Sequence, residues 1–365
     1  MFRSTKNILG RIGFLGYLGL LVSCSPRVAT SFWRIGTPAD STRAGYTVIH
    51  AEGKTRHCYP ITEWTDSIQP NYTGKGDTYH QLHHHGVAVE SEHMAYRIYF
   101  DKKQTIDPYC KRTPQLELAQ SHWYPNDSLL AAGYGDDILR VSGTVGVGSV
   151  KYWNGQKMVH IEPVAERSQR IVSSKKDRAT IEVSVKGWLP SSNSQNSQNS
   201  QNSQSTPSTP INLSARYTLR AGHRDMRCDV SLSDTVPGLC TGVQFIPAKS
   251  STPRTPSDTS IIILPNGVLL ASWGTDWPVN DSAKYAKETV GLAVFIPKAY
   301  AGALVHDKQN NLCLIKPKIE NRKSGERATA HFYLTCVGAT KENHPVARNA
   351  TEWNEYLRRW ASKLR

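Results

Sequence analysis

The sequence predicts an all-β fold, a large antiparallel β-sandwich with one C-terminal helix. Three observations support this. Short segments that alternate apolar and polar residues recur from His85 onward, turn residues separate them, and one amphipathic stretch ends the chain. Alternation with a period of two buries one face of a strand, and regularly spaced strands joined by turns are typical of antiparallel sandwiches and barrels.

Eight segments are expected to form strands, and the alternation is clearest in the first four. In the first of them, Tyr96 and Ile98 point to one face while Arg97 and Tyr99 point to the other. Pro265-Asn266-Gly267 lies between two of the segments and is a strong hairpin signal. The expected strands are Ala95–Phe100, Thr180–Trp188, Ile211–Leu219, Met226–Leu232, Ile261–Leu264, Val268–Ala271, Val290–Ile296 and His331–Val337.

The end of the chain predicts one clear helix. Glu352 lies near its start and Arg358 near its end, as the helix dipole favours. We expect this helix to pack on a sheet edge, and binding to a membrane surface is the alternative. Its apolar residues form one stripe: Trp353, Tyr356, Leu357, Trp360 and Leu364.

We expect the chain to divide into a signal peptide (1–23), an irregular N-terminal segment (24–75) and a single β-sandwich domain (76–365). Ser191–Pro210 is a low-complexity tract of Asn-Ser-Gln repeats that cannot form a core. The strands on each side of it resemble the two arms of one hairpin. We therefore expect a disordered insertion at a hairpin tip, within one domain.

The N-terminus indicates export. Arg3, Lys6 and Arg11 precede an apolar run, 12–22, that is too short to span a bilayer. Small residues before Cys24 fit a lipoprotein cleavage site, where a lipid is attached to the thiol. An ordinary signal peptide with an incidental cysteine is the alternative. We expect a lipid anchor in the membrane and a periplasmic orientation, with display at the cell surface as the alternative.

The other cysteines leave the redox state open. An oxidising compartment permits disulfides, but spacing does not determine their pairing. Cys313 and Cys336 are nearly symmetric about the turn 323–326 and are candidate cross-strand neighbours; free buried thiols are the alternative. The spacings match no zinc pattern, so we predict no cofactor, and a divalent metal stays open. The six cysteines are Cys58, Cys110, Cys228, Cys240, Cys313 and Cys336.

The charge indicates the class of partner. The formal net charge is +14, and removal of Arg3, Lys6 and Arg11 with the signal leaves +11. A basic protein attracts polyanions, and outside the cytoplasm these are lipid headgroups and acidic or sulfated polysaccharides. Simple solubility is the alternative explanation of the charge. We expect an acidic oligosaccharide as partner, contact with the membrane through the lipid anchor, no nucleic acid, and a monomer.

The segment 80–137 is the densest in polar and aromatic residues. Trp and Tyr stack on sugar faces, Asp binds hydroxyls, and Arg or Lys neutralises a carboxylated sugar. The alternative is that the aromatics are half-buried sheet residues and the histidines a structural cluster. The candidate site residues are His84, Arg97, Asp107, Tyr109, Lys111, His122, Trp123, Tyr134 and Asp136.

Several stretches resemble one family. They are His84–Glu92, Ala95–Asp101, Gln104–Tyr109, Gly133–Asp137 and Ala221–Asp225, and together they resemble the domain-of-unknown-function 4861 family over about residues 75–345. The resemblance implies exported proteins, often lipoproteins, of polysaccharide-degrading bacteria. It implies a supersandwich related to galactose-mutarotase-like and polysaccharide-lyase domains, and, for some relatives, dehydration of uronate-ended oligosaccharides. Cys110, where the pattern usually has glycine, and the Asn-Ser-Gln insertion depart from it.

We therefore expect β-elimination on an acidic oligosaccharide, by a dehydratase or a lyase. Removing the C5 proton requires a neutralised carboxylate, a base and an acid for the leaving group. Arg97 and Lys111 are the candidates for the carboxylate, and we expect Arg97→Ala to abolish turnover without unfolding the domain. His84 or Tyr109 is the candidate base, and His122 or Tyr134 the acid.

The other candidates complete the expected site and its rivals. Asp107 and Asp136 would orient hydroxyls or a catalytic side chain, and Trp123 would stack on a sugar. A non-catalytic sugar-binding lipoprotein is the first alternative. A mutarotase or glycoside hydrolase is the next, although the neighbouring Asp136 and Asp137 are not expected to face each other across a substrate.

Overall fold

The computed structural model describes residues 83–118, 120–121, 124–175, 177–190, 209–246, 259–279, 285–322 and 325–364, with four short strands before them. The segment predicted to be a signal peptide lies outside the described residues, as do Cys24, Cys58, His122, Trp123 and residues 191–208 of the insertion. None of the helices in this described part is long and apolar enough to cross a membrane.

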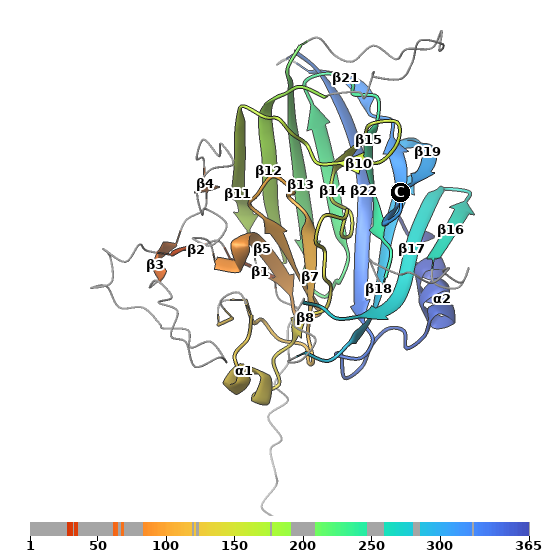
Figure 1. The fold of residues 1–365 in the computed structure, drawn as a ribbon. Helices are drawn as coiled ribbons and strands as arrows, with labels where there is room; N and C mark the ends of the chain where they lie inside the picture. The colour runs from red at the N-terminus through yellow and green to blue at the C-terminus, as the bar shows by residue number, and fades with distance from the viewer. Residues whose placement is uncertain are drawn as a thin grey trace, which may run out of the picture.

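The large sheet has ten strands and forms the centre of the molecule (Figure 1). All its pairings are antiparallel. In spatial order its strands are β16 (Thr259–Leu264), β17 (Gly267–Asp276), β18 (Glu288–Pro297), β22 (Gly325–Gly338), β14 (Met226–Leu232), β13 (Ile211–Arg220), β12 (Arg178–Trp188), β11 (Glu166–Ser174) and β4 (Ser67–Ile68), and β21 (Lys318–Arg322) pairs with β22.

Two smaller antiparallel sheets lie against the large sheet. The N-terminal sheet is ordered β1 (Val28–Ser31), β5 (Gly86–Ser91), β6 (Met94–Tyr99), β7 (Ile106–Cys110) and β8 (Asp136–Asp137). The second small sheet is ordered β10 (Met158–Val159), β9 (Lys151–Trp153), β15 (Leu239–Gln244), β20 (Asn310–Ile315) and β19 (Ala301–His306). A separate ribbon pairs β2 (Trp33–Ile35) with β3 (Ile61–Trp64).

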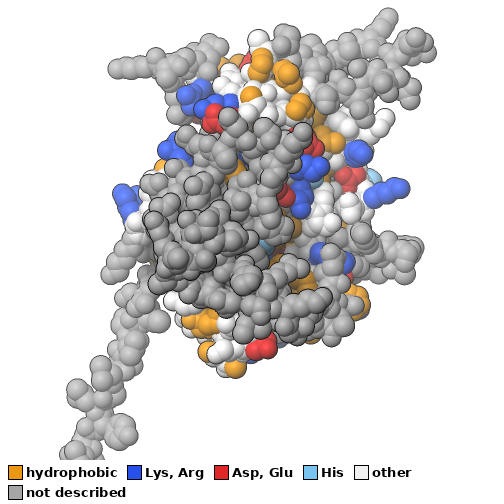
Figure 2. Space-filling view, turned by 60° about the vertical axis from the view of Figure 1, so that its left-hand side comes forward, with side chains coloured by type: hydrophobic (Ala, Val, Ile, Leu, Met, Phe, Trp, Pro, Cys, Tyr) orange, Lys and Arg blue, Asp and Glu red, His pale blue; other side chains and the backbone are white. Residues whose placement is uncertain are grey.

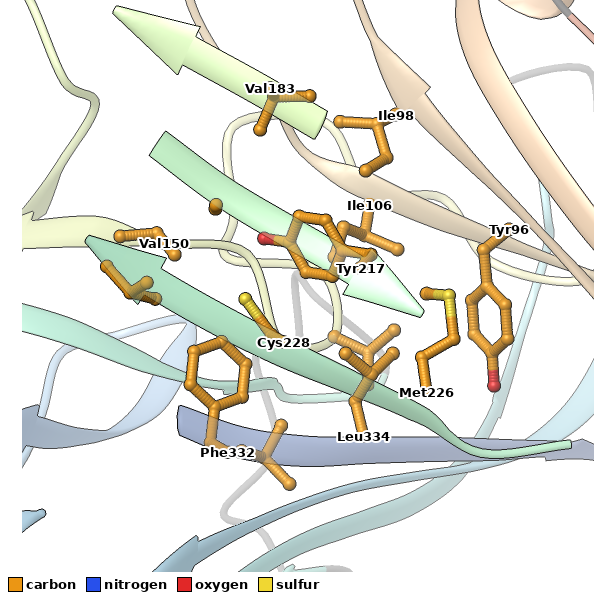
Figure 3. Close-up of a cluster of buried hydrophobic side chains, with 14 of the residues drawn as sticks. Tyr96, Ile98, Ile106, Val150, Val183, Tyr217, Met226, Cys228, Phe332 and Leu334 are labelled. Atoms are coloured by element: carbon orange, nitrogen blue, oxygen red, sulfur yellow. The ribbon is translucent and has the colours of Figure 1, made fainter. Parts of the chain in front are cut away.

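The core lies between one face of the large sheet and the two small sheets. Figure 3 shows Tyr96 and Ile98 of the N-terminal sheet facing Tyr217, Met226 and Leu334 of the large sheet. Alternation produces this layer, because buried and more exposed residues follow each other along the whole of β13. Each fully buried large apolar side chain contributes about 1.5–3 kcal/mol. The all-β sandwich expected from the alternation is thus confirmed.

The eight expected strands are all present, with ends shifted by a few residues. The two-residue turn Pro265-Asn266 joins β16 to β17, as expected. The N-terminal segment 24–75 differs from the prediction, because it is not irregular throughout. β1 pairs with β5 and β4 pairs with β11. These strands are so short that they carry no readable alternation, and an existing sheet edge supplies their partners.

The two strands that flank the insertion pair directly with each other. β12 and β13 are antiparallel neighbours from the pair of Arg178 with Arg220 to that of Trp188 with Ile211. The expectation that they are two arms of one hairpin is confirmed. The long tract therefore does not interrupt the sheet, although the register shifts between Val185 and Trp188, close to the tract.

The helix α2 (Ala350–Ala361) packs on the face of the large sheet opposite the small sheets. Trp353 and Leu357 are buried against Ala293 and Phe295 of β18. The expected position on a sheet edge is therefore corrected to a position on the sheet face, at its β16–β18 end (Figure 1). The apolar stripe requires a flat apolar surface, and the outward residues of these strands provide one.

The helix ends are capped by side chains. Asn349 precedes the first turn and its Oδ1 accepts a hydrogen bond from the Glu352 amide at 2.9 Å. At the other end, the side-chain amide of Asn266 donates to the carbonyls of Ala361 at 2.8 Å and Leu364 at 3.1 Å. The hairpin turn of β16 and β17 thus satisfies carbonyls that a helix end leaves unpaired.

The cysteines require one correction. Cys313 lies in β20 of the second small sheet and Cys336 in β22 of the large sheet, so they are not cross-strand neighbours. β21 and β22 pair with each other in the large sheet, whereas β20, which precedes β21 in the chain, belongs to the second small sheet. The five cysteines in the described residues are free and buried: Cys110, Cys228, Cys240, Cys313 and Cys336.

Candidate functional site

The N-terminal sheet separates apolar and polar side chains onto its two faces. Tyr96 and Ile98 of β6 point into the core, so Arg97 between them points away from it. The strand register places Asp107 of β7 beside Arg97, and Asp137 of β8 beside Tyr109. Partners in register share a face. Arg97, Asp107, Tyr109 and Asp137 therefore lie on the outward face of this sheet.

Arg97 is the centre of this cluster. Its Nη2 donates to Oδ2 of Asp107 at 2.7 Å and to Oδ2 of Asp137 at 2.8 Å. The Tyr99 hydroxyl donates to the same Asp107 oxygen, and the Tyr124 ring centroid lies 5.3 Å from the guanidinium carbon. Arg97 and Asp107 are both 0% exposed. We call Arg97, Tyr99, Asp107, Tyr124 and Asp137 the arginine cluster.

The arginine cluster holds more carboxyl groups than one cation neutralises. Burial raises the pKa of Asp137 well above its ordinary value, and the nearby Asp107 carboxylate raises it further. Burial also raises the pKa of Asp107, against the opposing effect of Arg97. Two close carboxyls of this kind share a proton. The raised pKa of Asp137 favours its protonated form.

The phenol of Tyr99 also stays protonated. Burial raises its pKa well above the ordinary value, and the Asp107 carboxylate adds to the effect. The cluster therefore contains hydrogen-bond donors, a carboxylate and a carboxylic acid within one dry layer. Such a set can accept and release a proton without a change in the positions of its atoms.

A second group of candidates pins the segment 112–135 onto this face. Glu90 accepts hydrogen bonds from the amides of Glu117 at 2.8 Å and Leu118 at 3.0 Å, and the Lys111 ammonium pairs with Glu90. The Tyr109 hydroxyl donates to the Gly135 carbonyl at 2.8 Å. Lys111 and Tyr109 thus hold the segment in place.

Tyr109 is a poor candidate for a base in this arrangement. Its hydroxyl is already a donor, and burial, with the nearby Glu117 carboxylate, raises its pKa above the ordinary value. Gly135 explains how the segment comes so close. A Cβ at this position would lie 1.7 Å from the Cys110 carbonyl oxygen, so only glycine fits.

His84 lies at the edge of the same face with an unusual backbone. His84 and His85 have φ angles of 56° and 59°, in the left-handed region that side chains other than glycine seldom adopt. His84 Nε2 lies 2.8 Å from the Leu118 carbonyl oxygen. Strained backbone of this kind is concentrated at functional sites and is maintained only by its surroundings.

The remaining candidates are not all brought together. Asp136 lies on the other side of the sheet from Arg97, 3.9 Å from the Lys341 ammonium, so Asp136 and Asp137 do not face each other. Tyr134 follows α1 (Asp127–Ala131) and is half-buried. His122 and Trp123 lie outside the described residues, and their roles stay predictions.

The expected role of Arg97 changes in detail. Both Arg97 and Lys111 point to protein carboxylates and are almost fully buried. Removing Arg97 would leave two buried carboxyls without their cation, at a cost of about 3–5 kcal/mol. We therefore expect Arg97→Ala to destabilise the domain, so that loss of turnover in this variant would not by itself assign a catalytic role.

The candidate set omitted Tyr99, Glu90, Glu117 and Asp137. The alternation already placed Tyr99 on the face of Arg97, so this residue was within reach of the sequence. Asp137 was not, because only the register of β7 and β8 brings it to Arg97. Within the described residues, no group of three or more His, Cys, Asp or Glu side chains is arranged to hold a metal ion.

The fold and the cluster define an all-β sandwich protein with a buried polar site on a small sheet. The chain belongs to the family described as domain of unknown function, DUF4861, whose model matches residues 37–365. No curated protein matches the chain.

Proposed function

We propose that this protein catalyses β-elimination on an acidic, uronate-containing oligosaccharide at the outward face of the N-terminal sheet. The observation that carries the proposal is the arginine cluster, in which the buried Arg97, Tyr99, Asp107 and Asp137 side chains meet and the half-buried Tyr124 ring lies over the guanidinium. Groups with strongly perturbed pKa values gather at functional sites, although structural ion-pair networks can show the same shifts.

The energetics also favour a function for the cluster. Buried ion pairs seldom stabilise a fold more than apolar residues of similar volume would. A cluster of five polar side chains is therefore a costly way to build a sheet face. The left-handed backbone of His84 and His85 beside it is a second local cost.

The chemistry of elimination matches the contents of the cluster. The C5 proton of a uronate is acidic enough to remove only when the neighbouring carboxylate is neutralised. A protonated Asp137 is a hydrogen-bond donor that serves this purpose, while Arg97 positions it and Asp107. Tyr99 supplies a proton to the leaving group through its bond to Asp107, and His84 is the proposed base.

The atoms balance in this scheme. The base takes the C5 proton, the C4–O bond breaks, and the electron pair of the C5–H bond forms the C4–C5 double bond. A proton passes to the departing oxygen. Loss of water makes the protein a dehydratase, and loss of a sugar makes it a lyase.

A non-catalytic sugar-binding protein is the second candidate. Its support is that Arg97 and Lys111 are each paired with protein carboxylates and buried. In that case the arginine cluster only stabilises the sheet.

The test is the ultraviolet absorbance of the conjugated product, measured with the purified protein and a panel of acidic oligosaccharides. Tyr99→Phe is the test variant and Tyr96→Phe is its matched control. Both lie in β6, both phenols are buried hydrogen-bond donors, and they point to opposite faces. Loss of a proton-transfer group reduces turnover by about 10²–10⁴-fold.

We expect this loss in Tyr99→Phe and near-normal turnover in Tyr96→Phe, with mass spectrometry separating loss of water from chain cleavage. Binding without absorbance change on every substrate would replace elimination by the sugar-binding function. Equal loss in both variants would remove the arginine cluster from the mechanism.

A further inference from the structure

A basic groove lies on the opposite side of the molecule from the arginine cluster. It is formed by α2, by the outward face of β12, β13, β14 and β22, and by the turn 221–225, and it encloses about 1080 Å³. Ligand pockets commonly enclose about 300–1,000 Å³, so the groove has room for more than one sugar ring. Its cationic lining residues are Arg178, Arg220, Arg224, Arg227, Arg359 and Lys363.

The strand alternation explains why these cations gather there. Leu219 and Met226 point into the core, so Arg220 and Arg227, next to them on β13 and β14, point outward. α2 packs on the outward face over β17 and β18, and Tyr333 and Val337 of β22 belong to the same apolar cluster as the helix. The uncovered part of the face therefore meets the last turn of α2, which adds Arg359, and the residue Lys363 beyond it.

Two of the cations are neutralised within the protein. Arg224 forms a bidentate ion pair with Glu342, in which Nη1 and Nη2 each lie 3.1 Å from a carboxylate oxygen. Arg227 forms an ion pair with Asp229. Arg178, Arg220, Arg359 and Lys363 have no ion pair in the described part of the chain. The one acidic residue in the described lining, Asp225, lies 3.2 Å from His223.

The strand register makes this excess of charge costly. Arg178 and Arg220 are direct partners across β12 and β13, and like charges in such a pair destabilise a sheet. Elsewhere on the same face the protein avoids this cost, because Glu182 lies between Arg170 and Arg216 and pairs with both. An anion bound in the groove would neutralise the charge of Arg178, as Glu182 neutralises that of Arg216.

Aromatic side chains line the same groove. Tyr333 and Tyr356 are half-buried, and the Tyr356 ring stacks on Trp353 with the centroids 5.4 Å apart and the planes at 9°. Rings fixed in this way present a flat apolar surface beside the cations. Sugar faces stack on such surfaces, and guanidinium groups bind carboxylate or sulfate bidentately.

We propose that this groove is a second glycan-binding site, which takes a stretch of anionic oligosaccharide several sugars long. The combination of aromatic rings with unneutralised arginines in a hollow favours a glycan over a lipid headgroup, because a bilayer surface meets protruding cations more readily than recessed ones. The site lies apart from the arginine cluster, and its occupancy does not depend on the proposed elimination.

The experiment measures the affinity of the whole protein for two probes, a heparin-derived hexasaccharide and a hexagalacturonate, by calorimetry. The test variant is Arg178→Gln with Arg220→Gln. The matched control is Arg170→Gln with Arg216→Gln, which removes two charges from the same sheet face outside the groove. Thermal unfolding verifies the fold, and the test variant should melt no lower than the native protein because a repulsive pair is removed.

We expect at least one probe to bind, with an affinity reduced about tenfold or more in the test variant and by less than about twofold in the control. Failure of both probes to bind, or equal weakening by the two variants, would overturn the proposal. Vesicles with anionic phosphatidylglycerol are the third probe, and binding to them alone, lost in the test variant, would reassign the groove to the membrane.

The two proposals fail separately. Tyr99→Phe should leave hexasaccharide binding in the groove unchanged, and the Arg178→Gln, Arg220→Gln variant should keep its turnover on short oligosaccharides. Loss of turnover in the groove variant on short substrates would place the groove within the elimination site.

Discussion

Arg97 illustrates how little the identity of one residue determines about its role. The alternation of β6 places it outside the core, and this alone made it a candidate for an exposed carboxylate binder. The pairing of β6 with β7, and of β7 with β8, adds two carboxyls to its surroundings. A cation with two internal partners is a positioning residue, and its substrate contact has to be supplied by the groups that it holds.

The shared proton of Asp137 predicts a pH effect on stability. The folded pKa of Asp137 lies above its unfolded value, so the folded state holds a proton that the unfolded state has lost. This stability is present below the unfolded pKa and is lost as the pH rises through the folded pKa. As the pH rises above the ordinary carboxyl pKa of about 4, the free energy of unfolding should therefore fall.

Asp137→Asn tests this effect, because the amide keeps the shape and the acceptor oxygen but cannot titrate. Urea unfolding at several pH values should show a shallower fall in the variant than in the native protein. Asp234→Asn, at an exposed carboxyl, is the control and should leave the slope unchanged. An identical slope in Asp137→Asn would mean that Asp137 is ionised in the folded protein.

Among the elements, α2 buries almost the same apolar stripe that the sequence predicted. Its apolar stripe was readable in the sequence, and Trp353, Leu357 and Trp360 are the residues that it buries. What the pattern did not contain is the partner surface. At that end of the sheet, β17 and β18 carry apolar residues on both faces. The helix covers the outward face, which the core does not bury.

Leu357→Ala should lower the free energy of unfolding by about 2–5 kcal/mol, because it leaves a cavity between the helix and the sheet. Leu357 is 0% exposed. Arg358→Ala, on the exposed side of the same turn, should change it by less than about 0.5 kcal/mol. Chemical denaturation measures both. A small effect of Leu357→Ala would show that the helix can leave the sheet at little cost.

The whole molecule presents two chemically different faces. The N-terminal sheet carries its buried charges in ion pairs. On the face shown in Figure 2, exposed Lys and Arg side chains lie together with exposed Asp and Glu side chains. The groove on the far side of the large sheet holds cations that the described residues leave unneutralised. The groove is thus one place in the described part of the chain where positive charge is concentrated.

The proposed lipid anchor concerns the whole molecule and is tested in the cell. Cys24→Ala should move the protein from the membrane fraction to the soluble fraction, because acyl chains supply the binding energy of an anchored protein. Cys58→Ala is the control and should stay with the membrane. Retention of Cys24→Ala in the membrane fraction would exclude lipidation at this residue as the anchor.

The sequence alone determined the features that depend on local periodicity. Strand alternation, the turn at Pro265-Asn266, the C-terminal helix and the hairpin that spans the insertion each follow from residues within one short window, because side-chain direction repeats every two residues in a strand and every 3.6 in a helix. The alternation also predicted that Arg97 points away from the core.

Only the tertiary structure decided which distant residues meet. The register of separate strands brought Asp137 to Arg97, placed Asp136 on the other face, put Cys313 and Cys336 in different sheets and aligned Arg178 with Arg220. Burial likewise turned Lys111 and Tyr109 into anchors of the covering segment. The physical reason is that pairing across a sheet depends on the whole set of apolar faces packing together, which no single window of sequence contains.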